Sequence, residues 1–323
     1  MKYLYLIIFV IIVIIYLFIS SYSKNKNLEN GKINETMCKY VSSRGILKSC
    51  DIHSSKPISS IKQLKDYDFS KLKDNCSIYV CTSAIPEFVK MIDKINVKFY
   101  LVSGDADESC PTDILSDEEF ITFIENDKII KWMAQNCVKE HAKLFKLPIG
   151  LDYHSIVGGH FMNPIQHEKL MIDIINKSKP FYEREIKCYV NFLSGSMFNM
   201  FKNFGYDRKD AIDKISPKLI YAEQIRVNRY ESFQNQIKYA FVVSPHGNGL
   251  DCHRTWEALC TGSIPIVKTS PLDSLFSDLP VLIVNDWSDV NKELLEKTIN
   301  EFKNKKFNYN KLLLKYWVDM IKS

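Results

Sequence analysis

The stretch SPHGNGLDCHRTWEAL, from Ser244 to Leu259, combines residue types that can hold a phosphorylated ligand. Its glycines let backbone N–H groups approach an anion closely, and the N-terminus of the helix expected after them favours negative charge. Arg254 and Glu257 are three residues apart, so they share one face of that helix. A guanidinium pairs bidentately with phosphate oxygens, and a carboxylate accepts hydrogen bonds from two hydroxyls. Together they predict a nucleoside diphosphate site, with Arg254 at the diphosphate and Glu257 at the ribose.

A purely structural role is the alternative for this stretch. In that case Arg254 and Glu257 form an ordinary helical ion pair, and the glycines only close a turn, since short glycine motifs arise often by chance. The stretch is not a P-loop, because no Lys-Ser follows the glycines, and it lacks the third glycine of G-x-G-x-x-G. These differences disfavour a kinase or a dehydrogenase.

The elements that would position these residues alternate between strands and helices. The expected strands cover residues 77–83, 97–104, 129–136, 145–153 with its exit loop, 186–196, 218–224, 238–245, 263–270 and 279–286. The expected helices cover residues 86–94, 118–126, 167–179, 208–215, 230–237, 291–303 and 310–321. Such alternation indicates an α/β protein with parallel sheets. The glycine loop then follows the carboxyl end of a strand, where open α/β sheets bind ligands. Asp251 is expected to be the N-cap of its helix and Gly262 to end that helix.

The longer stretch SPHGNGLDCHRTWEALCTGSIPIV resembles the C-terminal signature of exostosin-like glycosyltransferases, including those encoded by large DNA viruses of algae and protists. That pattern runs Ser-Pro-x-Gly, then Asp-x-His-Arg-x-x-Glu-Ala-Leu, then Gly-x-Ile-Pro-Val. The upstream stretches YLVSGDADES, KWMAQN and LPIGLDYH are similar to the N-terminal halves of such proteins. The resemblance therefore extends over about residues 75–290.

The resemblance implies a GT-B fold, in which two Rossmann-like domains face a cleft and the C-terminal domain holds the nucleotide sugar. It also implies inverting transfer from a donor that is most often UDP-linked to a glycan or glycoprotein acceptor, with no cofactor required. Carried over by position, Arg254 contacts the donor diphosphate and Glu257 the ribose. The residues that would shape the donor loop are Ser244, His246, Gly247, Asn248, Gly249 and Asp251.

Glycosyl transfer to an alcohol needs a base and a means of stabilising the departing nucleoside diphosphate. The helix N-terminus and Arg254 can stabilise the diphosphate without a metal ion. Arg208 and Arg226 are further candidates for the phosphates, and the alternative is that both are exposed helix arginines. The base is expected from the first domain, across the cleft from Arg254.

Asp105 and Asp107 are the first candidates for this base, because they directly follow the strand expected at 97–104. Asp152 and His154 are second candidates, and for all four a loop or capping role is the alternative. Asp105-Ala106-Asp107 is also a D-x-D triplet, which in GT-A glycosyltransferases binds a divalent metal. A GT-A-like, metal-dependent transferase is therefore the alternative enzyme, and a non-catalytic glycan-binding membrane protein is the alternative outside enzymes.

The N-terminus carries an uninterrupted apolar run, Tyr3–Ile19, of about 17 residues, near the lower limit for a membrane span. We expect a retained anchor, and the alternative is a cleaved signal peptide with its site near residues 20–23. Lys24, Lys26 and Lys32 follow the run and favour a cytoplasmic body, whereas anchored glycan enzymes are usually lumenal. The side of the membrane is left open.

Length and composition set the remaining expectations. The chain has 323 residues and a net charge of +5 that is spread without a Lys/Arg run, so no nucleic-acid partner is expected. Nine cysteines show neither C-x-x-C nor zinc-ligand spacing, so no metal site is expected and disulfides are left open. The expected organisation is a membrane anchor (1–22), a polar stem (23–60), an N-terminal acceptor domain (61–180) and a C-terminal donor domain (181–323). The last helix, 310–321, is expected to pack back on the first domain.

Overall fold

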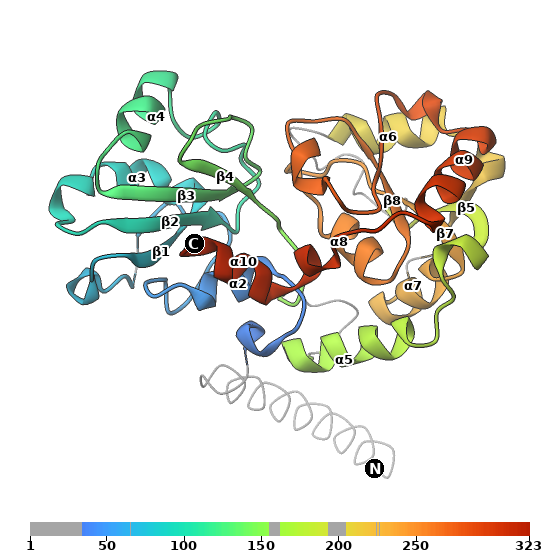
Figure 1. The fold of residues 1–323 in the computed structure, drawn as a ribbon, viewed down its shortest axis with the longest axis horizontal. Helices are drawn as coiled ribbons and strands as arrows, with labels where there is room; N and C mark the ends of the chain where they lie inside the picture. The colour runs from blue at the N-terminus through green and yellow to red at the C-terminus, as the bar shows by residue number, and fades with distance from the viewer. Residues whose placement is uncertain (1–33, 65, 155–161, 193–204, 224, 226) are drawn as a thin grey trace, which may run out of the picture.

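Two parallel β-sheets form the framework of the protein (Figure 1). The computed structural model describes residues 34–64, 66–154, 162–192, 205–223, 225 and 227–323. The first sheet has the order β1-β2-β3-β4 and the second the order β6-β5-β7-β8-β9, with every pairing parallel. The strands are β1 (Cys76–Cys81), β2 (Phe99–Gly104), β3 (Ile129–Gln135), β4 (Leu144–Leu147), β5 (Glu185–Val190), β6 (Ile220–Ala222), β7 (Tyr239–Val243), β8 (Ile264–Lys268) and β9 (Leu282–Val284). The expected α/β class and the parallel sheets are confirmed.

Helices cover both faces of each sheet. The α-helices are α2 (Ser43–Ser49), α3 (Ile85–Val89), α4 (Asp117–Ile124), α5 (Pro164–Ile175), α6 (Gly205–Lys214), α7 (Arg229–Gln236), α8 (His253–Cys260), α9 (Lys292–Lys303) and α10 (Leu314–Ile321). Short 3₁₀ turns include η1 (Glu35–Met37), η2 (Phe69–Lys71), η3 (Thr82–Ala84), η4 (Ile92–Lys94), η5 (Phe181–Glu183), η7 (Pro217–Leu219), η8 (Asp273–Phe276), η9 (Trp287–Asp289) and η10 (Tyr309–Leu312). We call β1 to β4 with their helices the first unit, and β5 to β9 with theirs the second unit.

Alternate side chains of the first sheet belong to two different cores, as strand geometry requires. One core contains Ile78 of β1, Leu101 of β2 and Trp132 of β3, together with side chains of α3 and α4. The opposite core contains Tyr79 of β1 and Met133 of β3, together with side chains of α2, α8 and α10. This second core therefore joins the two units by shared apolar burial rather than by a polar surface contact alone.

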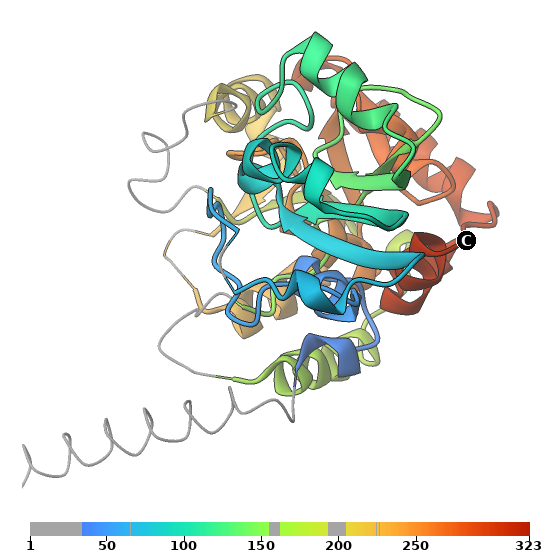
Figure 2. The ribbon, with the colours of Figure 1, turned by 90° about the vertical axis from the view of Figure 1, so that its left-hand side faces the viewer.

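Helices from the two ends of the described chain, α2 and α10, cover one side of the first sheet. α10 packs against α2, and the two lie together beside the first sheet (Figures 1 and 2). Lys131 of β3 donates hydrogen bonds to the carbonyl oxygens of Met320, at 2.9 Å, and Ser323, at 2.7 Å. The expected return of the last helix to the first unit is confirmed.

The expected stem differs from the structure in its described part. Ser42 caps α2 by accepting a hydrogen bond from the Gly45 N–H, and Ile46 and Leu47 are buried in the core shared by the units. Residues 34–60 therefore contribute to the folded body. Their burial depends on α10, more than 250 positions later in the chain, so local sequence periodicity gave no sign of it.

The strand order of the second sheet reverses direction between β5 and β7. β6 lies on one side of β5, whereas β7, β8 and β9 follow one another on its other side. α6 and α9 contribute to the core on one face, and α7 and α8 contact the opposite face. In open parallel sheets, ligands bind outside the carboxyl ends of the two strands at which the order reverses. A ligand site is therefore expected at the residues that follow β5 and β7.

Within the described residues, no helix has the length and apolar character needed to cross a bilayer. The expected anchor at Tyr3–Ile19 lies outside those residues.

Candidate functional site

The loop between β7 and α8 is fixed by hydrogen bonds. Ser244 is buried; its N–H donates to the carbonyl of Ile266 at 2.9 Å and its hydroxyl lies 2.8 Å from that of Thr255. The His246 N–H donates to a carboxylate oxygen of Asp207 at 2.8 Å. The His246 ring interacts with the carbonyl oxygen of Leu250 at 2.8 Å. The expected donor loop is therefore a preorganised turn at the carboxyl end of β7.

Two glycines let this loop make close approaches that a side chain would block. A Cβ atom on Gly249 would lie 2.7 Å from the Asn136 amide nitrogen and 3.0 Å from the Asp107 carbonyl oxygen, both in the first unit. A Cβ on Gly247 would lie 3.2 Å from a guanidinium nitrogen of Arg208. Gly249 thus sets the contact between the units, and Gly247 lets a cation approach the loop backbone.

Asp251 is not the N-cap of α8, and that prediction is wrong. The N-cap is Cys252, which makes no side-chain capping bond. The buried Asp251 carboxylate instead accepts hydrogen bonds from the Ile149 N–H at 2.7 Å and the Trp256 indole N–H at 2.9 Å. The Asp251 N–H donates to Asn136 Oδ1 at 2.9 Å. Asp251 therefore fastens the donor loop to the first unit.

Asp251 gives a testable dependence of stability on pH. Burial raises the pKa of Asp251 to about 6, although the hydrogen bonds it accepts from Ile149 and Trp256 and the nearby His253 act to lower it. The folded chain then binds this proton more tightly than the unfolded chain, so the free energy of unfolding falls as pH rises from about 4 to about 6. Asp251→Asn is expected to flatten this slope, by roughly 2–3 kcal/mol over the interval. Denaturant unfolding at pH 4, 5, 6 and 7.5 measures it, with exposed Asp173→Asn as the control; equal slopes in wild type and Asp251→Asn would contradict the assignment.

Arg254 lies where the sheet order reverses. Its Nε donates to Asn191 Oδ1, just after β5, at 2.7 Å, and its guanidinium lies 4.9 Å from the centre of the Phe192 ring. Its Nη1 is buried and has no hydrogen-bond partner among the described residues. Burial lowers the pKa of Arg254 and so works against its charged form. A buried donor of this kind stabilises an anion strongly.

Arg208 of α6 is the second cation at this place. It is 8% exposed, and burial together with the charge of Arg254 lowers the pKa of Arg208 to about 10. Arg254 and Arg208 also both act electrostatically on Cys252, the residue before α8. The alternative, that Arg208 is an exposed helix arginine, is therefore wrong. Two like charges, the Gly247 backbone and the N-terminus of α8 converge on one position, an arrangement that suits a diphosphate. Arg226 lies outside the described residues.

Glu257 has a partner that the sequence did not suggest. Its carboxylate accepts a hydrogen bond from Arg229, the first residue of α7, whereas Arg254 uses Asn191. The simple helical ion pair between Arg254 and Glu257 is therefore not formed. Arg229 also lies 3.7 Å from a carboxylate oxygen of Asp152 in the first unit. No motif singles out Arg229. Asn191 lies within the strand expected at 186–196, but the observed β5 ends one residue before it, so its place at the carboxyl end of the strand was not predicted.

The two acids after β2 have different environments. Asp105 is buried, accepts a hydrogen bond from the Ser59 hydroxyl at 2.8 Å and lies 3.6 Å from an Arg44 guanidinium nitrogen. Asp107 is exposed. Although the residue is exposed, the protein around its carboxyl group removes part of its hydration and raises the pKa of Asp107, while interactions with Asn248 of the donor loop and with His253 act to lower it. Of the two expected base candidates, only Asp107 is accessible beside the donor loop.

The second pair of base candidates lies at the same junction. His154 Nδ1 is 3.3 Å from a carboxylate oxygen of Asp152, and His253 Nδ1 lies 2.7 Å from the Gly150 carbonyl oxygen. Asp152, His154 and His253 each offer one ligand atom within 4.8 Å of the others, so this is a group that could hold a metal ion. Arg229 beside Asp152 would repel a cation. We therefore interpret the group as a hydrogen-bonded network that links the two units.

A comparison of the chain with models of protein families and with curated protein sequences gives no match. The geometry just described is therefore the basis for the function.

Proposed function

We propose that this protein is a GT-B glycosyltransferase that moves a sugar from a nucleotide sugar, with UDP as the expected nucleotide, to a glycan acceptor with inversion and without a metal ion. The observation that carries the proposal is the buried guanidinium of Arg254 at the point where the second sheet reverses order. This is the position at which α/β sheets bind nucleotides, and the side chain there is the one best suited to a diphosphate.

The residues divide the chemistry between the two units. The acceptor hydroxyl forms a new bond to the anomeric carbon while the bond from that carbon to the diphosphate oxygen breaks. Asp107 takes the hydroxyl proton, because it is the accessible carboxylate across from the loop. The departing diphosphate gains negative charge, which Arg254, Arg208 and the N-terminus of α8 stabilise.

Glu257 is proposed at the donor ribose, with Arg229 fixing its orientation from α7. A carboxylate held by an arginine at one oxygen retains acceptor capacity for a sugar hydroxyl. The metal-dependent alternative based on Asp105 and Asp107 is less well supported, because Asp105 already pairs with Arg44 and Ser59.

Thermal unfolding of the full chain in detergent, against a panel of nucleoside diphosphates with Mn²⁺ or EDTA, tests the proposal. UDP at 100 times its Kd is expected to stabilise the protein by about 2.7 kcal/mol, and EDTA is expected to leave this unchanged. Stabilisation that requires Mn²⁺ would favour a metal-dependent transferase. No stabilisation by any nucleotide would overturn the proposal in favour of a non-catalytic protein.

A further inference from the structure

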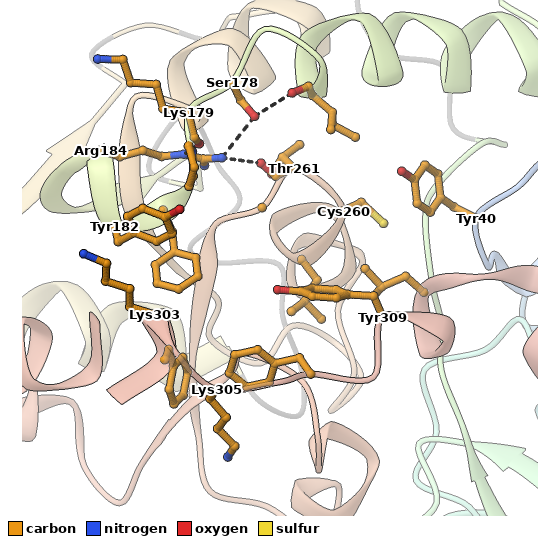
Figure 3. Close-up of a pocket in the computed structure, with 18 of the residues that line it drawn as sticks. Tyr40, Ser178, Lys179, Tyr182, Arg184, Cys260, Thr261, Lys303, Lys305 and Tyr309 are labelled. Atoms are coloured by element: carbon orange, nitrogen blue, oxygen red, sulfur yellow. Dashed lines mark hydrogen bonds between the residues drawn. The ribbon is translucent and has the colours of Figure 1, made fainter. Parts of the chain in front are cut away.

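A cavity of about 650 Å³, drawn in Figure 3, is lined by Cys260 at the C-terminal end of α8. The donor loop precedes the other end of this helix. The walls of the cavity come from the start of the described chain, the segment before β5, the C-terminal end of α8 and the segment after α9. α8 has eight residues, so the cavity is separated from the donor loop by about 12 Å of helix. It is therefore distinct from the site assigned to the nucleotide sugar.

Aromatic side chains form much of the cavity wall. Tyr182 is 40% exposed and Tyr309 is 49% exposed, so both rings offer apolar area to a ligand. Figure 3 shows Tyr309 between Tyr182 on one side and Tyr40 on the other. Phe307 packs against the Tyr309 ring with centroids 6.2 Å apart and so supports it from behind. Rings of this kind present an apolar face and a polar edge, which suits a sugar.

The charge of the cavity has one sign. The described residues that line the cavity include no Asp or Glu. They include four exposed lysines: Lys39, Lys179, Lys303 and Lys305. In the part of the chain that the structure describes, none of these lysines forms an ion pair with a carboxylate. A cavity with unopposed positive charge attracts anions.

Lysine ammonium groups of the cavity lie close to aromatic rings. The Lys303 ammonium lies 5.2 Å from the centre of the Tyr182 ring, and that of Lys305 lies 5.5 Å from the Phe307 ring. On the opposite wall, Lys39 lies 5.2 Å from the Tyr40 ring. Three of the four lysines are therefore paired with an aromatic surface, so one ligand unit can contact a ring and a charge together.

Arg184 has a structural role in this cavity. Its guanidinium donates to the Thr261 carbonyl at 2.8 Å (Figure 3). It also donates to the Ser263 hydroxyl at 2.8 Å, and Arg184 is 8% exposed. It holds the segment before β5 against the end of α8, and the lysines are left to contact a ligand.

We propose that this cavity is a second binding site that takes an acidic oligosaccharide. The exposed tyrosine rings stack on sugar rings, and the lysines at the rim pair with carboxylate or sulfate groups along the chain of sugars. A compact phosphate ligand fits less well, because the lysine side chains extend in different directions (Figure 3) and the carbonyl end of α8 is negative. The volume lies within the range of ligand pockets, which favours a few sugar units over a flat membrane surface.

This inference rests in part on the proposed function: the cavity would hold an acidic glycan while the donor site acts on another part of the same glycan. Binding of the glycan in the cavity requires no donor and no turnover. The test is titration of the full chain in detergent with a hexamer of galacturonic acid, a heparin hexasaccharide and neutral maltohexaose. The acidic hexasaccharides are expected to bind at least tenfold more tightly than maltohexaose. The double variant Lys303→Ala, Lys305→Ala and the variant Tyr309→Ala are each expected to weaken that binding at least tenfold.

The matched control is Lys292→Ala, Lys297→Ala, which removes the same charge from exposed positions of α9. It is expected to bind the acidic hexasaccharides like wild type. Equal weakening in both double variants, equal binding of maltohexaose, or no binding would overturn the proposal. Binding only to phosphatidylserine vesicles would also overturn it and assign the surface to a membrane. UDP stabilisation, measured in parallel on the Lys303, Lys305 variant, reports the donor site separately.

Discussion

Arg254→Ala is expected to abolish transfer and to weaken UDP binding by about 100-fold or more. The variant removes the buried guanidinium that would make two charge-assisted hydrogen bonds to the diphosphate, a loss of about 3 kcal/mol. Folding is expected to persist, because burial disfavours this charge in the free protein and its removal relieves repulsion with Arg208. Binding and stability should therefore separate, which they would not do for a merely structural arginine.

UDP titration of the purified variants, together with unfolding of the nucleotide-free forms, measures this separation. Arg254→Lys is the conservative variant, and it is expected to recover only part of the affinity because an ammonium lacks the planar fork. Asn191→Ala is expected to have a smaller effect, since it removes the 2.7 Å hydrogen bond that orients Arg254 but leaves the charge. Full UDP stabilisation in Arg254→Ala would show that the donor site lies elsewhere.

Asp107→Asn is expected to lower kcat by about 10²–10⁴-fold, the usual contribution of a positioned base. The asparagine keeps the shape of the side chain and its contact with the donor loop, so the Kd for UDP should stay within about twofold of wild type. Rates under single-turnover conditions and UDP titration, both on the same preparation, give the two numbers.

Asp105→Asn is the matched control, two residues earlier on the same loop. It weakens the interactions of a buried carboxylate with Arg44 and Ser59, so it should lower stability while the folded fraction retains turnover. If Asp107→Asn kept its full rate, the base would be sought in the pair formed by Asp152 and His154, with His154→Gln as the next variant.

Local patterns predicted the framework of the donor site well. A buried strand needs a continuous apolar run, and such runs placed both bounds of β7 within two residues and the start of β5 within one. The end of β5 was placed six residues too late. The position of Arg254 in the first turn of a helix was predicted correctly, because that helix begins directly after the glycine loop. Gly262 does end α8, with a φ of +74° that favours glycine.

Features that depend on distant contacts were not predictable in the same way. Asp251 had the residue type and position of an N-cap, but a buried indole and a backbone N–H from β4's exit loop compete for its oxygens. Arg44 neutralises Asp105 from a segment that looked like a stem. Arg229 reaches Glu257 only because α7 and α8 lie on the same face of the second sheet. The Trp256 indole is five positions from Asp251, but each of the other partners lies 28 to 102 positions from the residue it contacts.

The covering of the first sheet by α10 has a consequence for how the protein is made. Lys131 and Ser323 are separated by 192 positions, so a ribosome adding about 5–20 residues per second needs about 10–40 s to pass from one to the other. During this time the side of the sheet that carries Tyr79 and Met133 lacks its final helix. A part of the chain that emerges early is therefore covered late, and until then its apolar side is a surface that a chaperone can bind.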